Sequence, residues 1–349
     1  QGLGRVLAYQ GRFGSESFPK AQSFRKALGG ATAEDELAKA FSLFEKDDNV
    51  QSMSIVSAYR SLSALLQQRV TQFAKLCYNR QLANLSPVGQ VDNLSYKLQV
   101  DNLSYSYSEA HQALEFAEKD AETDAPTPRD FIRAYWLLGE SLVQMKNQNV
   151  TIKTPSEIHF YDEPFQRVKE TATVQAGNEL AVAERCLTEA LRRCRQVNLV
   201  ESEADILLAW ARLKWVIGES GNWGIGEVEK DLNEAREIAE RAGYRLQLAD
   251  IHLLSAELLL ETGGEKLLGL TAQEHLQLAK EYAKDVSTIE HLYQSKDKHF
   301  YDGIPEYELL KRGMTEQERI ENGYYVAYLI AEALEQKLMP STSRPLPST

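Results

Sequence analysis

Three acidic residues close together in the chain are the first candidates for catalysis. Glu201, Glu203 and Asp205 are spaced so that two carboxyl groups could share general acid–base work, one donating a proton while the other accepts one. They stand at the start of a predicted helix, and the partial positive charge at a helix N-terminus favours acidic side chains there. We interpret them as N-terminal helix acids, with acid–base catalysis as the alternative.

Other residue types that carry chemistry do not occur in this sequence at the spacings their chemistry needs. The histidines at positions 111, 159, 252, 275, 291 and 299 form no His-Glu-x-x-His pattern, and the three cysteines form no Cys-x-x-Cys pair. The sequence also contains no Gly-x-x-x-x-Gly-Lys-[Ser/Thr] phosphate loop and no Gly-x-Ser-x-Gly elbow. We expect Cys186 and Cys194, eight residues apart on one predicted helix, to be core or interface thiols. The sequence therefore predicts a protein that is not an enzyme and has no metal or cofactor.

The elements that would position these side chains follow a repeated pattern, Ala/Val-x-x-x-Leu-x-x-Ala. A spacing of four and then three places its three residues on one helical face. Each copy follows another predicted helix with a small residue at its centre, at Ser63, Gly139, Ala211 and Ala256. The pattern occurs at Ala110–Leu114–Ala117, Ala183–Leu187–Ala190, Val228–Leu232–Ala235 and Ala272–Leu276–Ala279. Such helix pairs bury their apolar faces only by stacking, so we expect an all-α fold, an α-solenoid of antiparallel helix pairs.

The helices of two pairs are separated by long insertions, near residues 79–108 and 147–178, and we expect both to be irregular. The first insertion contains Val91–Tyr96 (Val-Asp-Asn-Leu-Ser-Tyr), which is repeated as Val100–Tyr105. We interpret this duplication as a surface loop, with a dedicated binding loop as the alternative. We expect the second insertion to be a mobile or partly ordered loop.

The chain divides into four expected regions. Residues 1–48 form one or more N-terminal helix pairs, including Leu3–Gly11, Phe24–Leu28 and a helix near Glu34–Glu45, and residues 49–290 form the repeats. Residues 291–338 combine an irregular segment with a terminal capping helix, which a capping box at Thr315 and Glu318 would open. Residues 339–349 are rich in Pro and Ser, and we expect a disordered tail.

The inward-facing positions of the first helix in each pair can be counted from its central small residue. They lie six and three residues before it, and one and four residues after it. Charged residues alternate with large apolar ones at these positions, and Trp and Arg dominate binding hot spots. The expected concave groove consists of Arg133, Trp136, Glu140, Asp205, Leu208, Arg212, Trp215, Asp250, Leu253 and Glu257, with Val143 and Leu260 beside them. In the alternative interpretation, Trp136 and Trp215 only pack between adjacent pairs.

Composition limits the partners and the compartment. The 349 residues include 39 Lys and Arg against 51 Asp and Glu, a formal net charge of −12, which argues against nucleic acid or an anionic membrane as the partner. Three cysteines are too few for a disulfide framework, and no apolar run approaches the roughly 18 residues that would span a bilayer. We therefore expect a cytoplasmic protein with a protein or peptide partner. The chain begins at Gln1, and we expect it to be a piece of a longer protein.

The sequence resembles a tetratricopeptide (TPR) repeat array in three features. They are the central small residues, the turn glycines Gly11, Gly218 and Gly263, and the Ala-x-x-x-Leu-x-x-Ala helices. The helices are longer than in the usual 34-residue repeat, and in this respect the array resembles the C-terminal region of bacterial STAND-type (NACHT-like) signalling NTPases. Phe131–Leu142, Ala183–Trp215 and Ala235–Leu258 carry this likeness. The resemblance implies a sensor that binds a trigger and oligomerises through a nucleotide-switch domain that this sequence lacks. The alternative is a free-standing TPR scaffold or peptide-responsive regulator.

Overall fold

The chain is mostly helical, with one β-hairpin, over the part that the structure describes. This computed structural model describes residues 2–9, 32–82, 89–122, 127–152, 154–162, 167–218, 224–284, 317, 319–320 and 323–338. Its helices are α1 (Gly2–Tyr9), α3 (Ala33–Lys46), α4 (Val50–Leu82), α5 (Gly89–Ala121), α6 (Pro128–Asn147), α7 (Glu179–Gln196), α8 (Val200–Gly218), α9 (Ile225–Ala242), α10 (Arg245–Thr262), α11 (Ala272–Ala283) and α15 (Tyr325–Leu338). None of the described helices is both long and apolar enough to cross a membrane.

The helices that carry the repeated pattern pack against the helices that precede them. Contacts join α4 to α5, α6 to α7, α8 to α9 and α10 to α11. On α7, Ala183, Leu187 and Ala190 are fully buried, as the pattern predicts. The middle of α6, the helix before α7, needs a small residue, because a Cβ at Gly139 would lie 2.7 Å from Leu187 Cγ. The close approach of α6 and α7 therefore depends on Gly139.

Local signals account for several helix ends. Thr271 begins α11 with a capping box, in which its hydroxyl accepts from the Glu274 amide and the Glu274 carboxylate accepts from the Thr271 amide. Gly243 ends α9 and Gly263 ends α10, both in the left-handed conformation that glycine adopts most easily. The short connections expected around Gly263 therefore have the turn chemistry that the sequence indicates.

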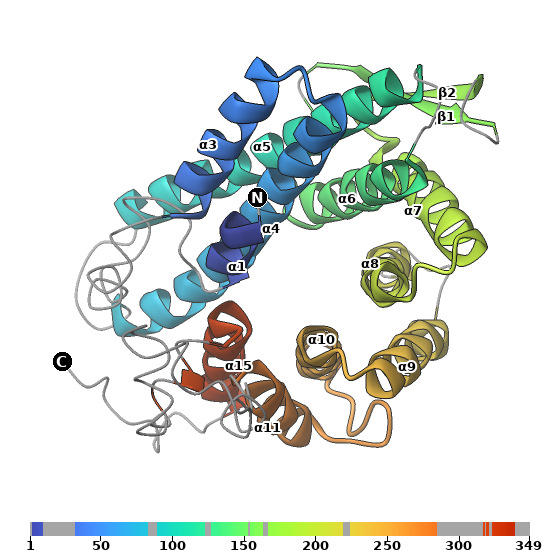
Figure 1. Cartoon of the computed structure of the whole chain (residues 1–349). Coiled ribbons are helices and arrows are strands. Elements are labelled where there is room, and N and C mark those ends of the chain that lie inside the picture. Colours follow the sequence, from blue (N-terminus) through green and yellow to red (C-terminus); the bar gives the residue numbers. More distant parts are fainter. Residues whose placement is uncertain are drawn as a thin grey trace, which may run out of the picture.

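The inner helices form a ring, and the part of the chain that the structure describes shows no open trough of the kind expected from the sequence (Figure 1). Helices α4, α6, α8 and α10 contact one another in that order, and α15 packs against α10, α11 and α4. Helices α3, α5, α7, α9 and α11 lie outside them. The chain returns to its starting helix because α15 contacts α4. Helix α1 packs beside α3, α4 and α15, and Leu7 and Ala8 are buried there.

Both long insertions contain regular structure, which corrects the expectation of irregular loops. The first insertion is helical where it is described: α4 extends to Leu82 and α5 begins at Gly89, so both copies of the duplicated segment belong to α5. The second contains an antiparallel hairpin, with β1 (Ser156–Tyr161) paired to β2 (Val168–Val174) and a bulge at Phe160 and Tyr161.

The hairpin is attached to the helices through both its side chains and its backbone. Ile158, Phe160 and Val174 are buried in the same core as residues of α5, α6 and α7. The β1 carbonyl oxygens of Glu157, His159 and Tyr161 accept hydrogen bonds from His111 on α5 (2.8 Å), Tyr135 on α6 (2.7 Å) and Arg193 on α7 (2.5 Å). These bonds satisfy the carbonyl oxygens on the edge of β1 that faces away from β2.

The C-terminal helix expected to run to about Leu338 is interrupted: Gln317, Arg319 and Ile320 are helical, and the chain leaves the helical conformation before α15. Gly323 and Tyr324 are not helical, and the Tyr324 amide donates to the Ala283 carbonyl at 2.7 Å before α15 starts at Tyr325. Thr315 and Glu318, the helix expected at Phe24–Leu28 and the tail 339–349 lie outside the described residues, as does most of the segment expected to be irregular.

Candidate functional site

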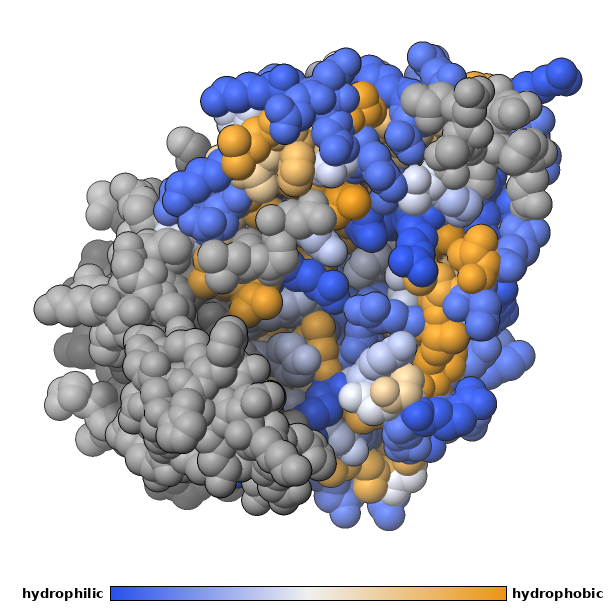
Figure 2. Space-filling model, in the orientation of Figure 1, coloured by the Kyte–Doolittle hydropathy of each residue, from blue (hydrophilic) through white to orange (hydrophobic). Residues whose placement is uncertain are grey.

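The charged residues predicted to face inward meet on the inner side of the ring. Arg212 on α8 donates to the Glu140 carboxylate on α6 at 3.1 Å, and Asp250 and Glu257 both lie on α10. Arg69 on α4 reaches across to α10, donating to Asp250 at 2.8 Å and lying 3.8 Å from Glu257. We call Glu140, Asp205, Asp250, Glu257, Arg69 and Arg212 the inner charge cluster. Figure 2, in the orientation of Figure 1, shows hydrophilic residues beside hydrophobic ones in the middle of the visible face of the molecule.

Arg69 is the member of the cluster that sequence reasoning missed. It lies six residues after Ser63, a position that does not face inward in the other pairs. It joins the cluster because α4 lies next to α15 and opposite α10 in the closed ring. The sequence does not single it out, because α4 contains four basic residues, Arg60, Arg69, Lys75 and Arg80, and no acidic residue.

One end of the ring is covered by α1. Arg5 forms an ion pair with Glu201 at 3.3 Å and lies over the Tyr59 ring, while the Tyr9 ring packs edge-on against Tyr324. Below them, Asp205 accepts from Gln247 at 3.2 Å, and burial raises the pKa of Asp205 to about 7. Arg133 also lies at this end, paired with Asp130 at 2.9 Å. This end of the ring is therefore closed by side chains.

The opposite end contains a small cavity of about 80 Å³, which we call the mouth cavity. The Trp215 indole donates to the Glu261 carboxylate at 3.0 Å and forms part of the wall. The cavity is lined from α4, α6, α8, α10 and α15, by Arg69, Gln144, Arg212, Trp215, Glu257, Glu261, Leu334 and Lys337 among others. Its lining thus includes the predicted residues Arg212, Trp215 and Glu257 from different repeats.

Several buried polar atoms beside the mouth cavity have no hydrogen-bond partner among the described residues. They are Glu140 Oε2, Glu257 Oε1 and Arg69 Nη2. The Glu140 side chain is only 8% exposed, and its other oxygen accepts from Arg212 and Gln144. Burial raises the pKa of Glu257, since removing water disfavours the carboxylate. Buried polar atoms in this state gain from a partner of opposite charge.

The remaining predicted groove residues pack within the protein. Leu208 and Leu253 are buried in two different cores, and Val143 is buried in a third. Trp136 is partly buried against the same core as Val143, which agrees with the packing alternative for this residue. Leu208 and Leu253 therefore support the ring, whereas Val143 also lines the mouth cavity, together with the predicted residue Leu260.

The three acids of the catalytic alternative have three different partners: Arg5 for Glu201, Arg195 for Glu203 and Gln247 for Asp205. Glu201 and Glu203 lie in the first turn of α8, and Glu203 accepts from Arg195 at 2.7 Å. Cys186 and Cys194 are buried free thiols, and burial raises the pKa of Cys194 to about 12. Within the described ranges, no three His, Cys, Asp or Glu residues lie close enough together to hold a metal ion.

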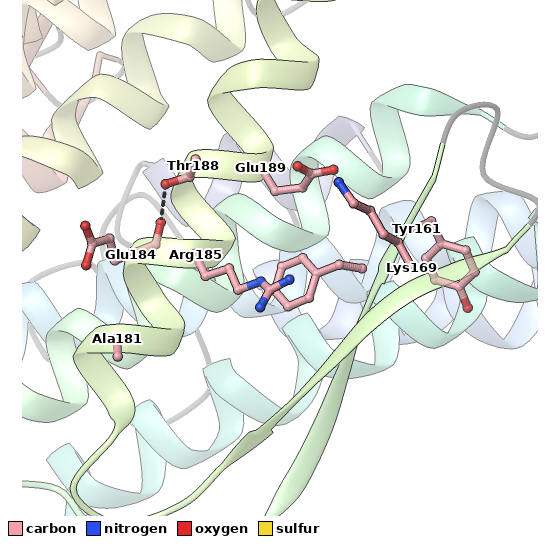
Figure 3. Close-up of a pocket in the computed structure, with 8 residues that line it drawn as sticks. Tyr161, Lys169, Ala181, Glu184, Arg185, Thr188 and Glu189 are labelled. Carbon is pink, nitrogen blue, oxygen red and sulfur yellow. Dashed lines mark hydrogen bonds between the residues drawn. The ribbon is translucent and has the colours of Figure 1, made fainter.

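A second cavity, of about 370 Å³, lies between α7 and the hairpin (Figure 3). Phe160, Tyr161 and Lys169 line it from the hairpin, and Arg185 lines it from α7. The Arg185 guanidinium is already engaged, because it pairs with Glu170 and lies 4.2 Å from the centre of the Phe160 ring. This cavity is larger than the mouth cavity, but it contains none of the predicted inward-facing residues.

We compared the chain with known proteins. No protein-family model, curated protein or solved structure matches it. The function is therefore inferred from the site itself.

Proposed function

We propose that this chain is a non-catalytic module that binds a protein or peptide at the mouth cavity. The observation that carries the proposal is that Arg69, Arg212, Trp215 and Glu257, from three inner helices, line one cavity. Trp and Arg contribute more to binding hot spots than other residues do, especially where water is excluded around them. Binding there needs no chemistry beyond charge pairing and apolar contact.

We further propose that the module is the sensor of a STAND-type signalling NTPase with a TPR-like array, acting in the cytoplasm. A trigger at the mouth cavity would contact α4 and α10 together with α15, and those helices close the ring. A ligand that binds the open and closed rings with different affinity shifts the balance between them. In a longer protein that shift would release an autoinhibited state. A free-standing TPR scaffold is the second candidate, and a phosphate-binding loop upstream of Gln1 in the gene would exclude it.

The site is tested with a pair of tryptophan variants. Peptides selected from a random display library on the wild-type chain are titrated against Trp215→Ala and Trp136→Ala. We expect Trp215→Ala to weaken binding at least about tenfold, as is typical of a hot-spot aromatic side chain, and Trp136→Ala to bind as the wild type does. Circular dichroism checks that both variants are folded. Equal binding by the wild type and both variants would place recognition elsewhere.

A further inference from the structure

We propose that β2 accepts an extended peptide segment of a partner as a third strand, added along the edge of β2 that faces away from β1. This surface is separate from the mouth cavity, so the inference goes beyond the proposed function. Three features of the hairpin carry it: the free backbone groups of β2, the anchoring of both strands and the balance of charge beside α7.

The outer edge of β2 has backbone groups without partners. Glu157 and His159 direct their carbonyls away from β2. Thr173 and Thr171 lie opposite them, so the backbone groups of these threonines point away from β1. Within the described ranges, no bond reaches the amide or the carbonyl of Thr171, or the amide of Thr173. The Thr173 carbonyl accepts from the Asn178 side chain at 2.8 Å. Two donors and one acceptor, at alternate residues of one strand, match the backbone of another extended chain.

This edge is open to a partner. The described sheet has two strands, and Figure 1 shows the hairpin at the periphery of the molecule. Thr171 and Thr173 are exposed, and β-branched residues suit a strand. Edge strands are commonly blocked by proline, by a bulge or by an inward-pointing charge. The bulge of this hairpin lies at Phe160 and Tyr161, and none of these features occurs from Thr171 to Thr173.

The helices hold the hairpin in place, so β2 is a template prepared before any partner arrives. His111, Tyr135 and Arg193, from three different helices, donate to carbonyls on the far edge of β1. Ile158 on β1 and Val174 on β2 are buried in the core. A two-stranded hairpin alone is only marginally stable, whereas this one is already ordered. Only the partner therefore loses conformational freedom on binding, which favours the complex.

Helix α7 forms a wall beside the hairpin. The cavity of about 370 Å³ lies between them, and Lys169 from β2 and Arg185 from α7 reach into it (Figure 3). The charges of its lining balance, with Lys169 and Arg185 against Glu184 and Glu189. Arg185 is also paired with Glu170. Since the lining has no excess of either sign, we assign recognition at this edge to backbone bonds rather than to charge.

A peptide segment fits this edge better than a second copy of the chain does. The free groups extend from Thr171 to Thr173, which is about 7 Å of strand. A stable dimer needs an interface of about 1,200–2,000 Å² in total, and two copies with a net charge of −12 each repel one another. A short extended peptide satisfies the same three groups without bringing two acidic chains together.

The test uses decapeptides selected from a random display library on Trp215→Ala, which removes the aromatic wall of the mouth cavity. They are then titrated against the wild type, Thr171→Pro and Thr171→Val. We expect Thr171→Pro to weaken binding at least about tenfold, because proline removes the donor and places its ring at the edge. Thr171→Val retains the amide and the β-branched shape, so it should bind within about twofold of the wild type. Circular dichroism and hydrogen exchange of the β1 amides check that both variants keep the hairpin.

Single N-methyl groups along a selected peptide give a readout that needs no protein variant. Thr171 offers one acceptor, so one peptide amide donates to it, while the amides of the two neighbouring residues point away from β2. We expect N-methylation to weaken binding at least about tenfold at that position and to have little effect on either side of it. Binding should also change less than about threefold between about 50 and 500 mM salt, because no excess charge drives it.

The outcomes separate this inference from the binding module at the mouth cavity. A library that yields no peptide sensitive to Thr171→Pro overturns the added strand and leaves the comparison of the two tryptophan variants unaffected. N-methyl groups that weaken binding equally at consecutive positions would also contradict it. Sedimentation of the wild type and Thr171→Pro tests the other occupant. Self-association of the wild type that Thr171→Pro abolishes would make a second copy the occupant and overturn the assignment to a peptide.

Discussion

Arg193 lies near the end of α7 with a side chain that is only 1% exposed. It pairs with Glu189 on its own helix and donates to the Tyr161 carbonyl on β1. Its guanidinium also lies 6.0 Å from the centre of the Tyr135 ring. One buried charge therefore connects α6, α7 and the hairpin.

We expect Arg193→Met to lower the free energy of unfolding by about 3–5 kcal/mol, because it leaves buried polar partners without their cation. Arg192→Met is the matched control, since Arg192 pairs with the same Glu189 from an exposed position. That change should cost no more than about 1 kcal/mol. Urea denaturation of both variants measures the difference, and equal costs would contradict the role assigned to Arg193.

Gly139 and Gly226 allow a second comparison at single positions. Alanine suits a helix better than glycine, but at Gly139 its Cβ would meet Leu187 at 2.7 Å. We expect Gly139→Ala to destabilise the protein by about 1–3 kcal/mol through overpacking. At Gly226 on α9 no atom lies within 4 Å of the added Cβ, so Gly226→Ala should stabilise by about 0.4–1 kcal/mol. Thermal melting of both variants tests the opposite signs.

A buried histidine pair joins α10 to α11. His275 Nε2 donates to the Leu267 carbonyl at 2.9 Å, so its Nδ1 accepts the proton of His252 Nδ1, 2.8 Å away. The His252 ring stacks on Tyr282. Burial, followed by the charges of His275 and Arg236, lowers the pKa of His252 to about 3. The folded protein therefore holds this histidine neutral.

This pair should make stability depend on pH. The unfolded chain binds a proton at His252 below about pH 6.5, whereas the folded chain does not. The contribution of the neutral His252 to the free energy of unfolding is therefore complete above pH 6.5 and is lost progressively toward pH 3. We expect the stability advantage of the wild type over His252→Asn to shrink by about 2 kcal/mol between pH 7.5 and pH 4.5. Urea denaturation at both pH values measures it. An advantage that is independent of pH would contradict the assignment.

At the scale of single elements, the hairpin contains a test of its own register. Glu157, His159 and Tyr161 direct their carbonyls away from β2, and in an antiparallel ladder the residue opposite such a position also points outward. Thr171, opposite His159, therefore makes no ladder bond, whereas Ala172, opposite Ile158, does.

We expect Ala172→Pro to destabilise the protein by at least about 1 kcal/mol more than Thr171→Pro, because proline removes a donor only where one is used. Hydrogen exchange of the β1 amides should increase in Ala172→Pro and change little in Thr171→Pro. Equal effects of the two substitutions would contradict this register.

The sequence carried the signal for the hairpin, although its interpretation as a loop was wrong. Ile158 and Phe160 alternate with Glu157 and His159, which is typical of a half-buried strand, and β2 is rich in β-branched residues. The interpretation of α5 as a loop failed for another reason. Its Asn- and Ser-rich duplication has weak helix propensity, and α5 is helical because it packs along α4.

The duplicated segment lies within α5. The copies are nine residues apart, which is about two and a half turns of an α-helix. In the second copy Leu103 is fully buried while Tyr105 is 39% exposed and donates to Glu34. The second copy is therefore part of a packed helix, and its interpretation as a surface loop is wrong.

At the scale of the whole molecule, the helix pairs were predictable and the closed ring was not. A local spacing, such as that of Ala183, Leu187 and Ala190, predicts which face of a helix packs against the helix next to it in the chain. Contact between α4 and α15 depends on curvature that accumulates over every pair, and no short motif encodes it. For the same reason Arg212, Trp215 and Glu257 were found from spacing, and Arg69 was not.

Ring closure is tested by placing a charge in the seam. Ile330 on α15 is only 1% exposed, within the core that α15 shares with α1, α4, α10 and α11. We expect Ile330→Asp to cost at least about 3 kcal/mol and to separate α15 from the ring. Hydrogen exchange should then increase in α1 and α15 while α6 and α7 remain protected. Glu332→Ala, exposed on the same helix, should leave exchange unchanged.

The bonds from His111, Tyr135 and Arg193 to the edge of β1 span helices from successive pairs. In a simple repeat array each unit contacts only its neighbours, so recombination can add or remove a unit while the other units keep their contacts. Here the loss or gain of a helix pair would break these bonds to β1, which recur at no other described junction. It would also change the number of inner helices in the ring and so disturb the contact between α4 and α15 that closes it. The number of units in this protein is therefore fixed by its architecture.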